Sequence, residues 1–159
     1  MLAAFTLFHV FLSLVGLGAG LIVLYGLLKS QRYDRWTKRF LVTTVATSVT
    51  GFLFPVQQFL PSHGVGILSL IVLAIAILAR YRYQLAGGWR RTYAITALIA
   101  LYFNFFVLIV QLFLKVPPLH ALAPAGSEPP FQIAQGSLLL LFIALTIRAV
   151  KTFHPEPSR

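Results

Sequence analysis

The chain has 159 residues, of which 58% are hydrophobic and only 10% are charged. Soluble domains carry about 25% charged residues, so this composition excludes a water-soluble fold. The formal net charge of +10 could fit a nucleic-acid-binding protein, but the basic residues flank long apolar segments instead of forming one basic face, which argues against nucleic acid as a partner.

Five apolar segments follow one another along the chain, and each is long enough to cross the hydrocarbon core of a bilayer, which takes about 17–25 residues. The first covers residues 2–28 and lacks the basic start of a cleaved secretory signal, so we interpret it as a retained span. The others cover residues 40–60, 65–83, 92–114 and 131–148. The sequence therefore predicts an all-α polytopic membrane helix bundle of five transmembrane helices. We expect one domain over residues 1–151, followed by a disordered cytoplasmic tail, residues 152–159.

The basic residues lie in three clusters, which follow the first, third and fifth segments. They are Lys29, Arg32, Arg35, Lys38 and Arg39; Arg80, Arg82, Arg90 and Arg91; and Arg148, Lys151 and Arg159, while Lys115 lies apart. Short loops rich in Lys and Arg stay on the cytoplasmic side of a membrane. This rule predicts that the N-terminus lies outside and the C-terminus inside. Short loops favour a bacterial cytoplasmic (inner) membrane, whose anionic lipids would face the basic clusters.

Small residues mark a helix contact in the first segment. Gly16 and Gly20 form a GxxxG pair, and Ser13 lies on the same side of the helix. Absent side chains let two helix backbones approach closely in lipid. We expect Ser13, Gly16 and Gly20 to pack against another helix, either within the bundle or in another subunit.

A neutral polar face runs through the second and fourth segments. Thr43, Thr47, Thr50 and Gln57 line one side of the second segment, and Asn104 and Gln111 share one side of the fourth. These six residues could line a path for a neutral or lipophilic solute such as a quinone. Threonines in a helix also bond back to their own backbone carbonyls, so the face need not be functional.

The predicted topology gathers several possible metal ligands on the outer side. They are His9, His63, His120 and Glu128. Neutral imidazole binds zinc, copper and haem iron, so these residues could hold haem or a transition metal. None of the histidine pairs has helical ligand spacing, however. His63 and His120 could equally be solvated loop residues, and His9 could hydrogen-bond a glutamine.

Catalytic patterns are missing from the sequence. It contains no HExxH, GxSxG or phosphate-binding glycine loop, no cysteine nucleophile, and no Asp or Glu within the predicted spans to relay protons. The first hypothesis is therefore a small non-catalytic accessory or structural subunit that packs against other membrane proteins or itself. The alternatives are a haem- or metal-binding membrane protein and an oligomeric carrier for a neutral or lipophilic solute.

Overall fold

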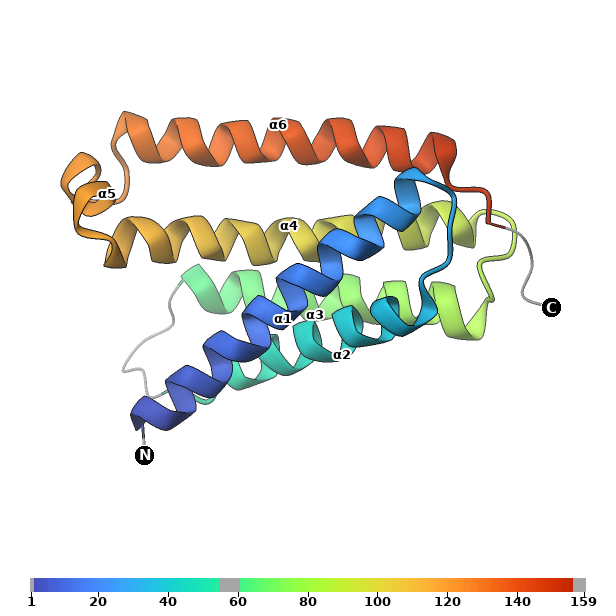
Figure 1. The fold of residues 1–159 in the computed structure, drawn as a ribbon, viewed down its shortest axis with the longest axis horizontal. Coiled ribbons are helices and arrows are strands. Elements are labelled where there is room, and N and C mark those ends of the chain that lie inside the picture. The colour runs from blue at the N-terminus through green and yellow to red at the C-terminus, as the bar shows by residue number, and fades with distance from the viewer. Residues whose placement is uncertain (1, 55–60, 156–159) are drawn as a thin grey trace.

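The regular structure is entirely helical in the computed structural model, which describes residues 2–54 and 61–155 (Figure 1). The elements are α1 (Leu2–Leu28), α2 (Asp34–Gly51), α3 (Pro61–Ile77), the π-helical turn η1 (Leu78–Arg82), α4 (Trp89–Lys115), α5 (Pro117–Leu122) and α6 (Pro129–Thr152). The prediction of an all-α fold is confirmed for this part of the chain.

Within the residues that the structure describes, four helical stretches are long and apolar enough to cross a membrane. They are Leu2–Leu28, His63–Arg82, Trp89–Lys115 and Pro129–Thr152. Each matches one of the predicted segments, with ends that differ by a few residues. Their length and composition indicate a membrane protein.

The helix predicted over residues 40–60 has different bounds. It begins at Asp34, six residues earlier, and ends at Gly51, while residues 55–60, including Gln57, lie outside the described residues. Arg and Lys are good helix formers, and a negative charge in the first turn suits the helix dipole. The helix therefore starts within the basic cluster and not at the first apolar residue. Its charged first turns keep α2 out of the four membrane-length helices.

The helices form a bundle in which successive neighbours run antiparallel. α2 packs on α3, α3 on α4, and α4 on α6, while α1 lies across α2 and also contacts α4 and α6 (Figure 1). Five helix ends meet at one end of the bundle (Figure 1). They are the end of α1, the start of α2, η1, the start of α4 and the end of α6. The three basic clusters, as far as the structure describes them, therefore gather at one end, which we call the basic end.

The hydrophobic core is concentrated in the half of the bundle next to the basic end. Its residues lie within Leu17–Leu27 of α1, at Phe40 and Leu41 of α2, within Leu73–Ala79 of α3 and η1, and within Tyr93–Leu101 of α4. The remaining ones lie between Phe142 of α6 and Phe153, the residue that follows this helix. Ala94, Ala97 and Ala100 on α4 are nearly inaccessible, because their small side chains let neighbouring helices approach closely. The opposite half of the bundle is packed less densely around a cavity.

The first residues of the predicted disordered tail are ordered by contacts with the bundle. Thr152 ends α6, and Phe153 is 1% exposed with its ring 6.1 Å from that of Tyr93. Arg90 donates a hydrogen bond to the Phe153 carbonyl, and the His154 amide donates to Ser30 Oγ at 2.7 Å. Burying an aromatic side chain contributes about 1.5–3 kcal/mol, which favours these contacts. Residues 152–154 therefore pack against the bundle, and residues 156–159 of the predicted tail lie outside the described residues.

Candidate functional site

A cavity of about 520 Å³ lies between α1, α2, α3 and α4, toward the helix ends opposite the basic end. Pockets that hold small molecules usually measure about 300–1,000 Å³. The lining comes from four helical regions: Thr6, His9, Val10, Ser13, Leu14 and Leu17; Thr47, Ser48, Gly51, Phe52 and Phe54; His63, Val65, Gly66 and Ser69; and Phe103, Asn104, Val107, Leu108, Gln111, Leu112, Lys115 and Val116. Most of these side chains are apolar.

Helical periodicity explains how distant residues come to line one space. On α4, Asn104, Leu108, Gln111 and Lys115 recur every three or four residues, which places them on one side of the helix. On α1 the same spacing brings His9 and Ser13 together with Leu17 and Thr6. The cavity thus follows one side of α1 and one side of α4.

His9 is held at the cavity wall by a hydrogen bond to α2. Its Nδ1 lies 2.8 Å from Thr50 Oγ1, and Thr50 donates its own hydroxyl hydrogen to the Ala46 carbonyl at 2.7 Å. Because a threonine hydroxyl has one hydrogen, we assign the hydrogen of the neutral ring to His9 Nδ1, which leaves Nε2 as an acceptor. The Phe54 ring lies edge-on to the imidazole, with the ring centres 5.2 Å apart.

Polar groups deeper in the cavity mostly bond to one another. Asn104 Nδ2 donates to Thr44 Oγ1 at 3.2 Å, and Ser48 donates to Ser69 at 3.3 Å. The Thr47 hydroxyl is buried and has no hydrogen-bond partner among the described residues. An unmatched buried hydroxyl carries a cost of about 1–3 kcal/mol.

The polar face predicted from the sequence is divided by the structure. Thr47, Asn104 and Gln111 line the cavity. Thr50 is used to hold His9, and Thr43 donates to the Arg39 carbonyl of its own helix at 2.7 Å. Gln57 lies outside the described residues, so its place relative to the cavity is not defined.

The small residues of α1 lie where this helix crosses its neighbours. A side chain at Gly16 would meet Thr43 Oγ1 at 3.2 Å and Thr44 Oγ1 at 3.3 Å, and one at Gly20 would overlap Leu101 of α4. Ser13 donates to the His9 carbonyl at 3.0 Å and lines the cavity. The two glycines therefore serve contacts within the chain, against α2 and α4.

The structure brings two of the three predicted histidines to the cavity, and the third does not belong to its lining. His9 and His63 both line the cavity, and the His63 ring lies 5.6 Å from that of Phe52. His120 belongs to α5, where its Nδ1 is 3.2 Å from the Phe113 carbonyl. In the described parts of the chain, no group of three His, Cys, Asp or Glu side chains could hold a metal ion.

Glu128, the fourth predicted ligand, organises the loop before α6. Its carboxylate accepts hydrogen bonds from the amide of Ala125 at 2.8 Å and from that of Ser127 at 2.9 Å. These backbone donors, Ala125 foremost, lower the pKa of the Glu128 carboxyl below its ordinary value. Glu128 therefore stays ionised and bound to its own loop.

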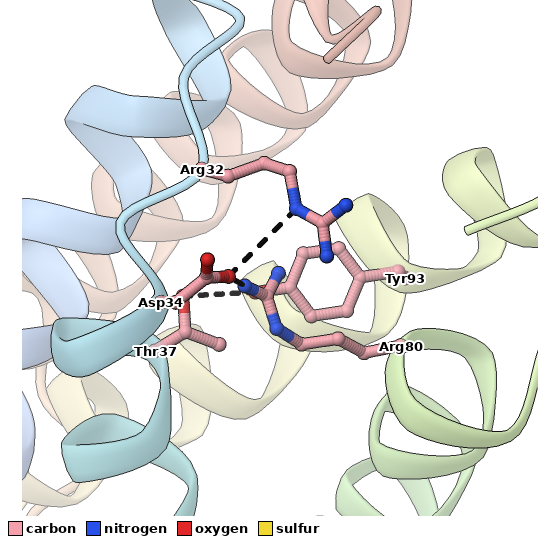
Figure 2. A network of polar contacts seen from close by, with 5 residues as sticks. All are labelled: Arg32, Asp34, Thr37, Arg80 and Tyr93. Atoms are coloured by element: carbon pink, nitrogen blue, oxygen red, sulfur yellow. Dashed lines mark hydrogen bonds and ion pairs between the residues drawn. The ribbon is translucent and has the colours of Figure 1, made fainter. Parts of the chain in front are cut away.

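A second polar cluster, which the sequence did not reveal, lies near the basic end (Figure 2). Asp34 of α2 pairs with Arg80 of η1, and Arg32 Nε lies 3.7 Å from the same carboxylate. The Arg80 guanidinium also lies 5.2 Å from the ring centre of Tyr93, whose hydroxyl is 3.5 Å from Thr37 Oγ1. The sequence feature that could have predicted this cluster is Asp34, the one acid within the basic clusters. This arrangement joins α2, η1 and α4 and contains no group poised for chemistry.

Searches of protein families, curated proteins and solved structures found none that matches this chain significantly. A functional conclusion therefore has to rest on the cavity and its lining. Of the two polar features, the cavity alone has room for another molecule.

Proposed function

We propose that this protein is a polytopic membrane protein that binds a small lipophilic molecule, without catalysis, in the cavity between α1, α2, α3 and α4. The supporting observation is the cavity itself: about 520 Å³, with a largely apolar wall surface, several neutral polar groups and one cation, Lys115. This is the usual composition of sites for small molecules, in which apolar walls supply affinity and polar groups set orientation. The proposed ligand is the kind of lipophilic molecule that the carrier hypothesis names.

The other two hypotheses draw less support from the geometry. The accessory-subunit hypothesis drew in part on the GxxxG pair, and Gly16 and Gly20 face α2 and α4 of the same chain. A haem or metal site was expected to use three histidines, and His120 lies apart from His9 and His63 on α5. The proposed function is therefore based on the cavity.

We further propose that the chain crosses a bacterial cytoplasmic membrane five times, with the N-terminus outside. The fifth crossing requires α2 together with the predicted segment to Leu60, of which residues 55–60 are not described. The gathering of cations at one end of the bundle supports this orientation, because basic loops remain in the cytoplasm. The cavity then opens toward the outer half of the membrane.

Filling the cavity tests the proposed function. Val107 lines the cavity, whereas Val110, on the same helix and also half-buried, does not. In lipid nanodiscs, a photoactivatable single-chain alcohol should label cavity-lining peptides of the unchanged protein. V107W should lower that labelling about 10-fold, because the indole occupies the space, and V110W should leave it within two-fold.

The lipid-facing side of α6 provides the internal standard for this measurement. Leu140 and Ile133 are strongly exposed and should be labelled equally in all three proteins. If cavity-lining peptides are labelled no more than those of α6, or if V107W and V110W behave alike, the proposed function is wrong.

A further inference from the structure

The cavity contains one charged side chain among its described lining residues, and that side chain is a cation. Lys115, the last residue of α4, contributes to the lining together with neutral polar and apolar groups. Lys115 is exposed, so its ammonium stays hydrated where the cavity meets the end of α4. A cation in that position favours an anionic group on a molecule that enters.

Neither acid of the described chain neutralises Lys115. Asp34 pairs with Arg80 and Arg32 at the basic end. Glu128 accepts hydrogen bonds from the amides of Ala125 and Ser127. The positive charge at this end of the cavity is thus available to a ligand.

The position of Lys115 gives the cavity a direction. Asn104 lies eleven residues earlier on the same side of α4, which corresponds to about 16 Å at 1.5 Å per residue. Val107 and Leu108 line the space between them, and Gln111 lies one turn before Lys115. Apolar side chains of α4 therefore line a path that leads from a cationic end, which has an amide beside it, toward the polar groups around Asn104.

The geometry points to a ligand class: a single-chain amphiphile with an anionic headgroup, either a carboxylate or a phosphate monoester. Its headgroup pairs with the Lys115 ammonium, and its chain runs along α4 past Leu108 and Val107 toward Asn104. The inference rests on the proposed function and adds the charge and the orientation of the ligand. A charge-assisted hydrogen bond of this kind is stronger than one between neutral groups.

Three photoactivatable probes of equal chain length test the inference in nanodiscs of zwitterionic lipid at pH 8: a carboxylic acid, an alkyl phosphate and an alcohol. Either acidic probe should label cavity-lining peptides about 3- to 10-fold more than the alcohol does. K115M should remove that difference, and K115R should preserve it. The matched control is K29M, at an exposed lysine of the basic end, which should change nothing.

The outcomes separate this inference from the proposed function. A preference for the carboxylate or for the phosphate identifies the headgroup, and either one supports the inference. Equal labelling by the acidic probes and the alcohol, or an acid preference that survives K115M, overturns the anionic ligand while the cavity keeps its function. If no probe labels the cavity above the lipid-facing side of α6, both proposals are wrong.

Discussion

At the scale of single residues, Arg80 is the charged residue that lies buried in the described part of the chain. Its side chain is 3% exposed, whereas that of its partner Asp34 is 68% exposed. A buried guanidinium needs an anion close by, because its desolvation is otherwise uncompensated. The Tyr93 ring beneath it adds a cation–π contact. The exposed carboxylate of Asp34 thus allows the Arg80 guanidinium to lie among packed helices.

We expect D34N to lower the free energy of unfolding in detergent by about 1–3 kcal/mol, because Arg80 stays buried but loses its charged partner. Thermal or denaturant unfolding followed by circular dichroism measures the change. R82Q is the control, since Arg82 lies on the same turn but is exposed, and it should shift stability by less than about 0.5 kcal/mol. Equal effects of the two substitutions would show that the pair is not what stabilises this region.

At the scale of elements, α1 shows how small residues fix a helix crossing. Gly20 faces Leu101 and Phe40, and a side chain added there would lie 3.0 Å from the Phe40 ring, whereas one at Gly18 would meet nothing within 4 Å. The sequence marked a contact surface by its GxxxG spacing. It did not show which helices would occupy that surface, because a glycine pair carries no information about its partner.

Two glycine substitutions on α1 should therefore have opposite effects. We expect G20A to lower the free energy of unfolding by about 1–3 kcal/mol, since the packed Leu101 and Phe40 must move. G18A should be neutral or stabilising by up to about 1 kcal/mol, because alanine restricts the unfolded chain and favours a helix. Detergent unfolding of both variants measures the difference, and a stability of G20A equal to that of G18A would contradict the close contact.

At the scale of the whole molecule, the two ends of the bundle differ in both charge and packing. The basic end has a dense core with the Asp34–Arg80 pair, and the opposite half contains the cavity. A dense half can hold the helices in place while the other half leaves room for a ligand. The proposed orientation puts the dense half toward the cytoplasm and the cavity toward the outside.

Cysteine labelling in intact cells tests that orientation, and the chain offers a clean background because it contains no cysteine. We expect A125C, in the exposed loop before α6, to react with a membrane-impermeant maleimide. Q84C, exposed between η1 and α4, should react only after the membrane is permeabilised. Reaction of Q84C in intact cells would contradict five crossings from an outer N-terminus, since four crossings would place this loop outside.

The sequence by itself determined the class of protein and the approximate course of its membrane-length helices, because hydrophobic length and charge are local properties of the chain. It placed α1, α4 and α6 closely and missed the start of α2, where charged residues continue the helix beyond the apolar stretch. It also picked out Thr47, Asn104, Gln111 and His9 as polar groups within the spans.

Only the tertiary structure decided which of these groups meet. It brought Thr47, Asn104 and Gln111 to one cavity with His9 and His63, left His120 on α5 and Glu128 in the loop before α6, and buried Arg80 beside Asp34. The physical reason is that such contacts depend on how helices cross, and the crossing is set by the packing of many small and apolar side chains together. Periodicity along one helix gives the direction of a side chain, and only the neighbouring helices give it a partner.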